Sequence, residues 1–261
     1  MDSYIQIAPQ NLLIAAALVV INLLLSYGFR LGLGRDLLWA SIRMSVQLWL
    51  VGYVLGWVFA LESPWPVLAV SLGMSAIAAQ SAIGRSQRRY PEIYWNSLVS
   101  ILTSTFLVSG VGVLGVLQVA PWFDPQYWIP ILGMLLGNIL NGISLALDRF
   151  LQGLSDGRFR VEGALALGAG AWEAAHPEIR EALRIGMIPT INSMMVMGIV
   201  SLPGMMTGQI LAGADPQDAV LYQIAIMFMI AAATALGALA MVLLTFRFLF
   251  RNHRLLSERL S

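Results

Sequence analysis

The sequence predicts an all-α integral membrane protein whose 261 residues form a single transmembrane domain, residues 1–261. Hydrophobic residues make up 58% of the chain and charged residues 11%, whereas soluble domains carry about 25% charged residues. Apolar stretches of about 20 residues, each long enough for a membrane helix, recur along the chain. Short alternating segments typical of a membrane barrel are absent, so helices are expected to satisfy the backbone within the bilayer.

Apolar windows bounded by charges, proline and glycine predict seven transmembrane helices. In chain order they cover residues 11–29, 37–60, 64–84, 95–119, 127–148, 187–212 and 219–247. The segment before the first span contains Asp2 and no arginine, so it lacks the positive region of a signal peptide. We therefore expect the first helix to be retained as a membrane span.

Arginine placement predicts how these helices cross the membrane, because positively charged residues favour cytoplasmic loops. One alternating set of loops, with the C-terminal segment, contains Arg30, Arg35, Arg85, Arg88, Arg89, Arg149, Arg158, Arg160, Arg180, Arg184, Arg247, Arg251, Arg254 and Arg259. The opposite set contains no arginine but Glu62, Asp124, Asp215 and Asp218. Only Arg43 lies within a predicted span. The N-terminus is therefore expected outside and the C-terminus in the cytoplasm.

Residues 149–186 form the longest predicted loop, which lies on the cytoplasmic side between the fifth and sixth spans. A loop of this length is usually functional or disordered. Its richness in Ala, Leu and Glu predicts helices at residues 161–167 and 172–185, lying on the inner face of the membrane. The sequence His176-Pro177-Glu178 is typical of a helix start with proline at its first position. We therefore expect an ordered and functional loop.

The composition argues against several classes of function. All basic side chains are arginine apart from two histidines, so the chain lacks the lysine of a G-x-x-x-x-G-K-S/T nucleotide loop, and any nucleotide must be bound by another protein. The chain has no cysteine, which excludes disulfides and thiolate metal sites. His176 and His253 are both predicted to be cytoplasmic, which argues against an intramembrane enzyme. An ion-driven secondary transporter is an alternative, although it should carry acidic or histidine relays within its spans.

The long loop contains a motif of another kind. Glu162 to Gly168, with the sequence E-G-A-L-A-L-G, resembles the E-A-A-x-x-x-G motif in the coupling loop of bacterial ABC importers. The importer motif has alanine where this chain has Gly163. That motif ends with Ile-x-Leu-Pro, and the nearest equivalent here is Ile188-Pro189, which lies farther along and lacks the leucine. The resemblance implies that Glu162, Ala164 and Gly168 couple the spans to an ATPase. Gly168 would permit a tight turn, and Glu162 would meet a basic groove or stabilise its own helix dipole.

Over nearly its whole length the chain resembles the Fet-type iron-export permeases, a family of bacterial ABC transporter membrane subunits with plant relatives linked to aluminium tolerance. Residues 188–213 carry most of this resemblance, and residues 36–43 with Gln47, and 137–142, support it. It implies a homodimer of permeases in the bacterial inner membrane, in contact with lipid and with a cytoplasmic ABC ATPase subunit. It also implies iron as cargo, Mg-ATP bound in the partner, no cofactor in this chain and no nucleic acid.

The sixth predicted span contains Pro203-Gly204 about midway, which predicts a kink or an unwound stretch. Broken helices at mid-depth often line substrate paths, although a proline kink can also simply fit neighbouring helices. Polar side chains are costly in hydrocarbon, so those within spans are further pathway candidates. These are Asn138, Asn141, Asn192 and Gln209. Each amide could equally form an interhelical hydrogen bond, and Asn138, Asn141 and Asp148 could face a common cavity.

Met194 and Met205 belong to a methionine cluster around the predicted kink and are pathway candidates as well. Thioethers prefer soft ions such as Cu(I), whereas iron and aluminium favour oxygen or imidazole ligands. No histidine or acidic residue lies near the centre of a predicted span. Three interpretations stay open: the methionines are adaptable packing, the cargo is soft, or iron crosses as a chelate. The sequence assigns no metal ligand.

Overall fold

The computed structural model describes residues 9–61, 63–84, 88, 90–251 and 254–255. Within these ranges the chain is helical apart from its connections and a hairpin of two-residue strands, β1 (Phe250–Arg251) and β2 (Arg254–Leu255), which confirms the helical class. Several residues used in the sequence arguments lie outside the described part: Asp2, Glu62, Arg85, Arg89, His253 and Arg259. The chain divides into two compact units, Met1–Glu62 and Ser63–Ser261.

The first unit contains two helices, α1 (Pro9–Gly28) and α2 (Gly34–Phe59), joined by a tight turn. Gly32 adopts a φ of +74° in this turn, and the Leu31 N–H donates to the Ser26 carbonyl oxygen at 2.9 Å. Among the described side chains of both helices, only Ser26 and Val58 are buried. The exposed remainder is mostly apolar, as contact with lipid requires.

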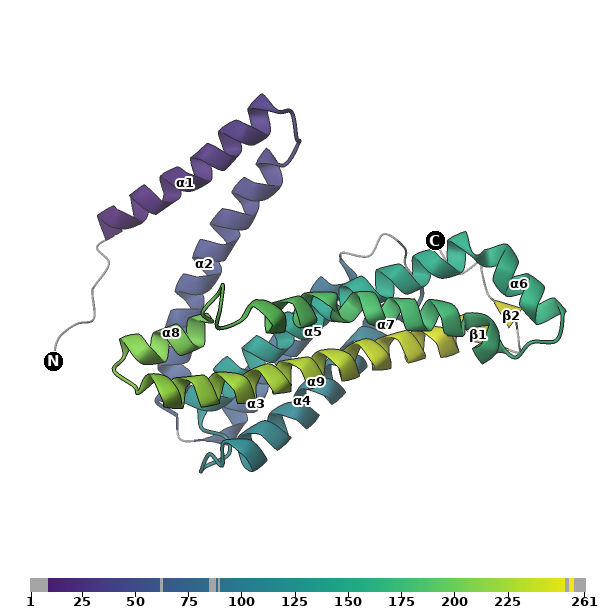
Figure 1. The fold of residues 1–261 in the computed structure, drawn as a ribbon. Coiled ribbons are helices and arrows are strands. Elements are labelled where there is room, and N and C mark those ends of the chain that lie inside the picture. Colours follow the sequence, from purple (N-terminus) through teal and green to yellow (C-terminus); the bar gives the residue numbers. More distant parts are fainter. Residues whose placement is uncertain (1–8, 62, 85–87, 89, 252–253, 256–261) are drawn as a thin grey trace. The chain divides into compact units, whose positions relative to one another are not determined.

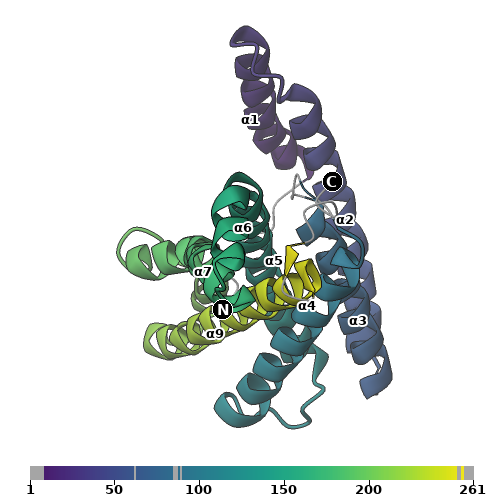
Figure 2. The ribbon, with the colours of Figure 1, turned by 90° about the vertical axis from the view of Figure 1, so that its right-hand side faces the viewer.

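The second unit is a bundle in which α5 (Pro125–Asp156), α7 (Ala171–Val196) and α9 (Pro216–Leu249) lie side by side (Figures 1 and 2). α3 (Pro64–Ile83) packs against α5 and against α4 (Ile93–Gly110), which also packs against α9. α4 passes into a π-helical stretch, η1 (Val111–Val116). Many of the fully buried side chains belong to α5: Ile131, Leu132, Leu135, Ile139, Ile143 and Leu147. α5 is therefore the central helix of the bundle.

Small residues allow α5, α7 and α9 to approach closely. A Cβ atom on Gly186 of α7 would lie 2.9 Å from the Gly142 carbonyl oxygen of α5 and 2.9 Å from the Ala146 Cβ. A Cβ on Gly237 of α9 would lie 2.8 Å from a methyl group of Ile139. Such approaches are typical of membrane helix packing, where small residues replace a hydrophobic driving force with van der Waals contact.

Six helical segments in the described part of the chain are long and apolar enough to cross a membrane. They are Gln10–Gly28, Gly34–Phe59, Pro64–Ile83, Ile93–Val116, Pro125–Asp156 and Pro216–Leu249. The predicted span at residues 187–212 is not a continuous helix, because α7 ends at Val196 and α8 (Gly204–Leu211) begins after a break. The count of seven therefore stays a prediction, which holds if this broken segment also crosses the bilayer.

The predicted cytoplasmic loop is helical, but its helices differ from those expected. α5 continues to Asp156, and α6 (Arg158–Ala166) follows at once. The second predicted helix begins at Ala171 and runs without interruption to Val196, so Pro177 lies inside α7 and the predicted start there is wrong. The physical reason is a cap farther upstream, where the Glu173 carboxylate accepts from the Gly170 N–H at 3.0 Å.

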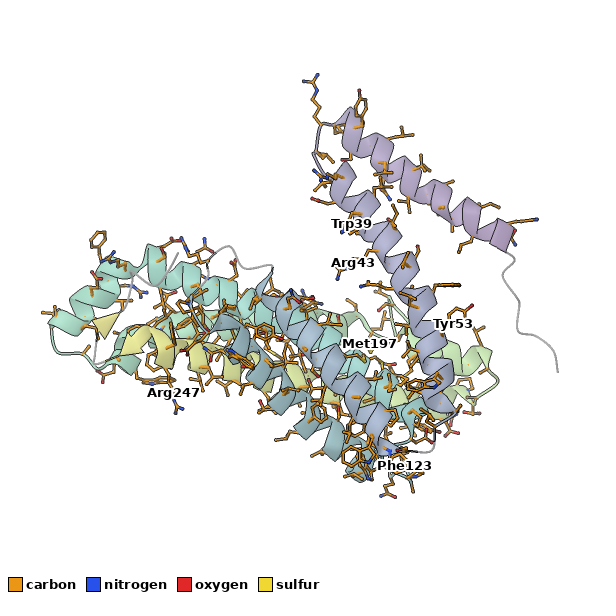
Figure 3. All side chains as sticks on the ribbon, turned by 180° about the vertical axis from the view of Figure 1, so that it is seen from behind. Trp39, Arg43, Tyr53, Phe123, Met197 and Arg247 are labelled. Atoms are coloured by element: carbon orange, nitrogen blue, oxygen red, sulfur yellow. The ribbon has the colours of Figure 1, made fainter. Side chains whose placement is uncertain are left out.

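Both ends of the second unit carry tryptophan side chains. Figure 3 places Phe123 and Arg247 at opposite ends. At the Phe123 end, Trp122 makes edge-to-face contacts with Phe123 and Trp128, with ring centroids 5.7 and 5.6 Å apart. At the Arg247 end, Trp172 contacts Phe246 with ring centroids 5.7 Å apart. Because tryptophan favours both membrane–water interfaces, these contacts do not distinguish the two sides, and the orientation stays a prediction.

Candidate functional site

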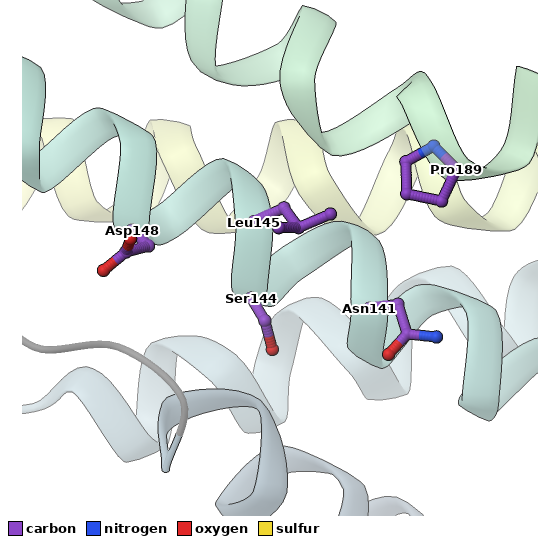
Figure 4. A pocket seen from close by; sticks show the side chains of 5 residues that line it. All are labelled: Asn141, Ser144, Leu145, Asp148 and Pro189. Carbon is purple, nitrogen blue, oxygen red and sulfur yellow. The ribbon is translucent and has the colours of Figure 1, made fainter. Parts of the chain in front are cut away.

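A cavity of about 280 Å³ lies between α5 and α7, and we call it the inner pocket (Figure 4). Its lining residues are Asn141, Ser144, Leu145 and Asp148 of α5 and Pro189 of α7. The four α5 residues share one helix face, because residues three, four and seven positions apart lie above one another. The structure thus brings Asn141 and Asp148 into one cavity. Asn138 is not among the lining residues, and its amide donates to the Met134 carbonyl oxygen at 2.9 Å.

The inner pocket carries oxygen atoms of three kinds: a carboxylate, an amide and a hydroxyl. The Ser144 hydroxyl donates to the Ala82 carbonyl oxygen of α3 at 2.9 Å, which orients its lone pairs. Oxygen ligands of this kind suit hard cations such as Mg²⁺, Mn²⁺ or iron better than soft ones. The lining oxygen atoms are therefore of the type that hard cations prefer, although Asp148 supplies the only carboxylate among the described lining residues.

The predicted break in the sixth span is present between α7 and α8. Met197 is extended, Gly198 has a φ of +82°, and the Gly198 N–H donates to the Ser201 carbonyl oxygen at 2.9 Å. Pro203 and Gly204 lie at the start of α8, where the Thr207 N–H and hydroxyl both donate to the Pro203 carbonyl oxygen at 3.0 Å. Glycine permits the positive φ at Gly198, and Pro203 suits the beginning of α8, because a helix start does not need the missing N–H.

Polar and sulfur atoms surround this break. The Gln223 amide of α9 donates to the Met197 sulfur at 4.0 Å, and Gln223 is 7% exposed. The Gln209 Oε1 atom of α8 is buried and has no hydrogen-bond partner among the described residues. Sequence reasoning missed Gln223, although an amide within the otherwise apolar α9 was a visible signal.

The remaining pathway candidates are spread over the broken segment. Asn192 is exposed on α7, Met194 is 38% exposed near its end, and Met205 is half-buried on α8. Met194 and Met205 belong to different helices, so they do not lie on one face of a single helix.

α6 carries the three predicted coupling residues. The Glu162 carboxylate accepts from the Arg158 guanidinium at 2.7 Å within α6, Ala164 is half-buried, and Gly168 takes a φ of +95° directly after the helix. Two residues that sequence reasoning did not single out are the most exposed: Phe159 at 88% and Leu167 at 91%. Eight residues are a little over two helical turns, so the two side chains lie on broadly the same side of α6, with Leu167 directly after its last residue.

An ion pair connects α6 to α7. Arg160 of α6 contacts Glu178 of α7, and the Glu178 residue is 9% exposed. The Glu178 side chain fills the space beside Gly153 of α5 that a Cβ atom would occupy. Burying a carboxylate is costly unless it is paired, so this contact fixes how three helices meet.

A hydrogen-bond chain joins the segment before α4 to α9. The Asn96 amide donates to the Tyr90 hydroxyl at 2.9 Å, and that hydroxyl lies 2.9 Å from the Thr245 hydroxyl, which donates to the Met241 carbonyl oxygen at 2.8 Å. Burial raises the pKa of the Tyr90 phenol, partly offset by its hydrogen bonds to Thr245 and Asn96. Tyr90 therefore stays neutral and can donate and accept at once.

The fold and these sites define a multi-pass helical membrane protein. The chain belongs to the family described as "Uncharacterised protein family (UPF0014)", which it matches over residues 9–250. It is 41% identical to a UPF0014 membrane protein of Synechocystis over 86% of each chain. It is 33% identical to the "Probable iron export permease protein FetB" of Escherichia coli, over 98% of this chain and 97% of that one.

Plant relatives extend the comparison. The chain is 36% identical to "Protein ALUMINUM SENSITIVE 3" of Arabidopsis thaliana over 86% of its own length and 82% of that protein. No solved structure matches the chain. Membership of the family confirms the resemblance noted from the sequence, and the Escherichia coli relative is the one named here as a probable iron export permease.

Proposed function

We propose that this chain is the membrane-spanning permease subunit of an ABC transporter, exporting iron or another metal with ATP hydrolysed by a separate cytoplasmic ATPase. Two copies of the chain would form the pathway in a bacterial inner membrane. The observation that carries the proposal is the pair of large apolar side chains exposed at α6: Phe159 in its first turn and Leu167 directly after it.

The exposed face of α6 is suited to docking a protein. Phe159, Gly163, Ala166 and Leu167 are all exposed and recur at helical spacing. α6 has 9 residues and cannot span a bilayer, and Arg158, Arg160 and Glu162 make it an aqueous or interfacial segment. Exposed apolar patches with a charged rim mark interaction sites. A groove on an ATPase would bury this face.

A mechanical route leads from α6 to the candidate pathway. Arg160 ties α6 to Glu178 of α7, and α7 is one continuous helix of 26 residues, about 39 Å at 1.5 Å per residue. That helix carries Pro189 of the inner pocket and ends at the break before α8. A displacement of α6 on ATP binding would therefore move one wall of the pocket as a rigid element.

The metal cargo is supported by the oxygen atoms of the inner pocket and by the name of the Escherichia coli relative. The methionines at the break leave a soft ion as the competing cargo. The runner-up function, an ion-driven transporter, is favoured by one observation: Asp148 places a carboxylate in the inner pocket. Dependence on ATP separates these two mechanisms.

The test is reconstitution of the full chain with its cognate ATPase in vesicles. Phe159→Asp with Leu167→Asp should abolish stimulation of ATP hydrolysis, because a charged face cannot enter an apolar groove. Glu162→Arg should weaken it by about tenfold or more, as loss of a charge pair at an interface does. Metal movement would be followed with iron and with copper in the same vesicles.

Glu181→Arg is the matched control for Glu162→Arg. Both glutamates are 38% exposed and pair with an arginine on their own helix, but Glu181 lies on α7. ATPase stimulation that survives the α6 substitutions would refute the docking role of α6. ATP-independent metal uptake driven by a proton gradient would favour the runner-up.

A further inference from the structure

A second cavity of about 320 Å³ lies at the end of the second unit, and we call it the outer pocket. It is lined by residues 117–120 after η1, by Asp124 and Tyr127 at the start of α5, and by Tyr222 in the second turn of α9. The inner pocket begins 14 residues further along α5, about 21 Å away along the helix axis. The two cavities therefore lie along the same central helix.

One residue lining the outer pocket carries an unsatisfied oxygen atom. The Tyr222 hydroxyl is buried and has no hydrogen-bond partner among the described residues. A buried hydroxyl without a partner costs free energy, so such atoms usually indicate a water, an ion or a functional role. Here the hydroxyl belongs to a residue of the cavity wall.

Two more acidic oxygens line the same cavity. Asp124 caps α5, with one carboxylate oxygen accepting from the Gln126 N–H at 2.9 Å, which leaves its second oxygen outside this contact. Tyr127 follows three residues later on the same side of the helix and is 43% exposed. α5 and α9 thus supply a carboxylate and two phenols to one cavity.

The oxygen atoms of these three residues favour hard cations. Phenolate and carboxylate oxygens are hard ligands, and no histidine, cysteine or methionine lines this cavity. We propose that Asp124, Tyr127 and Tyr222 form a binding site for a hard trivalent cation such as Fe³⁺ or Al³⁺. Each phenol loses its proton to water as its oxygen bonds to the metal, and no electron is transferred. Affinity should therefore fall as pH falls.

The place of this site in transport rests on the proposed function. The loop that contains Asp124 has no arginine and is predicted to face outward. In an exporter, the outer pocket would therefore be the last binding site that the cation occupies before release. Binding itself needs no ATPase. The cation site and the export function can therefore fail separately.

The experiment titrates the purified full chain, without ATPase, with iron(III) supplied as its citrate complex and with gallium(III) as a redox-inert probe. Iron(III) bound to tyrosinate produces a visible charge-transfer band, which a site without phenolate does not. We expect one metal per chain and this band for the unaltered protein. Tyr222→Phe and Tyr127→Phe should each weaken the band and lower affinity about tenfold or more.

The substitutions are chosen to spare the fold. Tyr222→Phe removes only an unsatisfied hydroxyl, so thermal stability should not fall. Asp124→Asn keeps the helix cap, because asparagine caps as well as aspartate, yet removes the charge. Tyr94→Phe on α4, outside the pocket lining, is the matched control and should leave both band and affinity unchanged.

A charge-transfer band and affinity that are the same in Tyr222→Phe, Tyr127→Phe and the unaltered chain would overturn the site. Binding of Cu(I) at the Met197 region with no Tyr-dependent iron(III) or gallium(III) binding would overturn it as well. If iron(III) binds as expected but no ATP-dependent metal movement occurs in vesicles with the ATPase, the cation site stands and the export function fails.

Discussion

At the residue scale, the bundle depends on a few contacts in which nothing larger than hydrogen fits. Gly186 of α7 faces the Gly142 carbonyl oxygen and Ala146 of α5. Both neighbours are fixed by the helix backbone, so they cannot turn away as a long side chain could. The inner pocket lies beside this contact, since α7 also contributes Pro189 to its lining. Close packing therefore also positions the pocket wall.

Gly186→Ala should accordingly destabilise the protein by about 1–3 kcal/mol, the usual cost of overpacking a well-packed interior. The measurement is thermal or denaturant unfolding of the full chain in detergent. Gly137→Ala on α5 is the matched control, because no atom lies within 4 Å of its added Cβ, and its stability should be unchanged or slightly higher. Equal effects at both glycines would refute the steric argument.

Residue-level sequence reasoning found some of the candidate sites and missed others for a physical reason. Asn141 was visible because an amide in an apolar stretch is costly, whatever surrounds it. The outer pocket was not visible, because Asp124 and Tyr222 lie far apart in sequence and meet only through packing of α5 against α9. Tyrosine is also common at the ends of membrane helices, so its presence there does not by itself indicate a ligand.

At the element scale, the broken segment and the long α7 are the main departures from the predicted helices. The Pro203-Gly204 pair indicated a break, and the break is present. The sequence did not indicate that α7 would join the cytoplasmic segment to this break. Hydropathy separates polar from apolar stretches, whereas α7 runs through both and even through Pro177, which donates no backbone hydrogen bond.

The continuity of α7 makes the Arg160–Glu178 contact a positioning pair between α6 and the pathway. Glu178→Gln should leave the ATPase bound but lower the metal moved per ATP several-fold, about threefold to tenfold, because a neutral amide holds the guanidinium less firmly. Arg184→Ala, which breaks the exposed pair with Glu181, is the control and should have no effect. Loss of ATPase binding in Glu178→Gln would indicate a fault in folding or docking instead.

At the scale of the whole molecule, the orientation depends on whether the α7–α8 segment crosses the bilayer. If it crosses, Ala214, between α8 and α9, faces outward and Arg180 on α7 faces the cytoplasm. If it re-enters and returns, both face the same side and the number of crossings is six. The absence of cysteine in the sequence makes this testable without background.

Ala214→Cys should therefore react with a membrane-impermeant maleimide in intact cells, whereas Arg180→Cys should react only after permeabilisation. Both positions are exposed, so accessibility rather than burial decides the labelling. The cysteine-free parent protein gives the background level of maleimide labelling. Labelling of both variants only after permeabilisation would show that the broken segment does not cross, and would place both termini outside, because α9 alone would then follow Ala214 and lead out of the cytoplasm. The outer pocket would keep its predicted side. Asp124 precedes the broken segment, and the side that its loop faces is predicted from the arginine-rich segments before α4 and after α5.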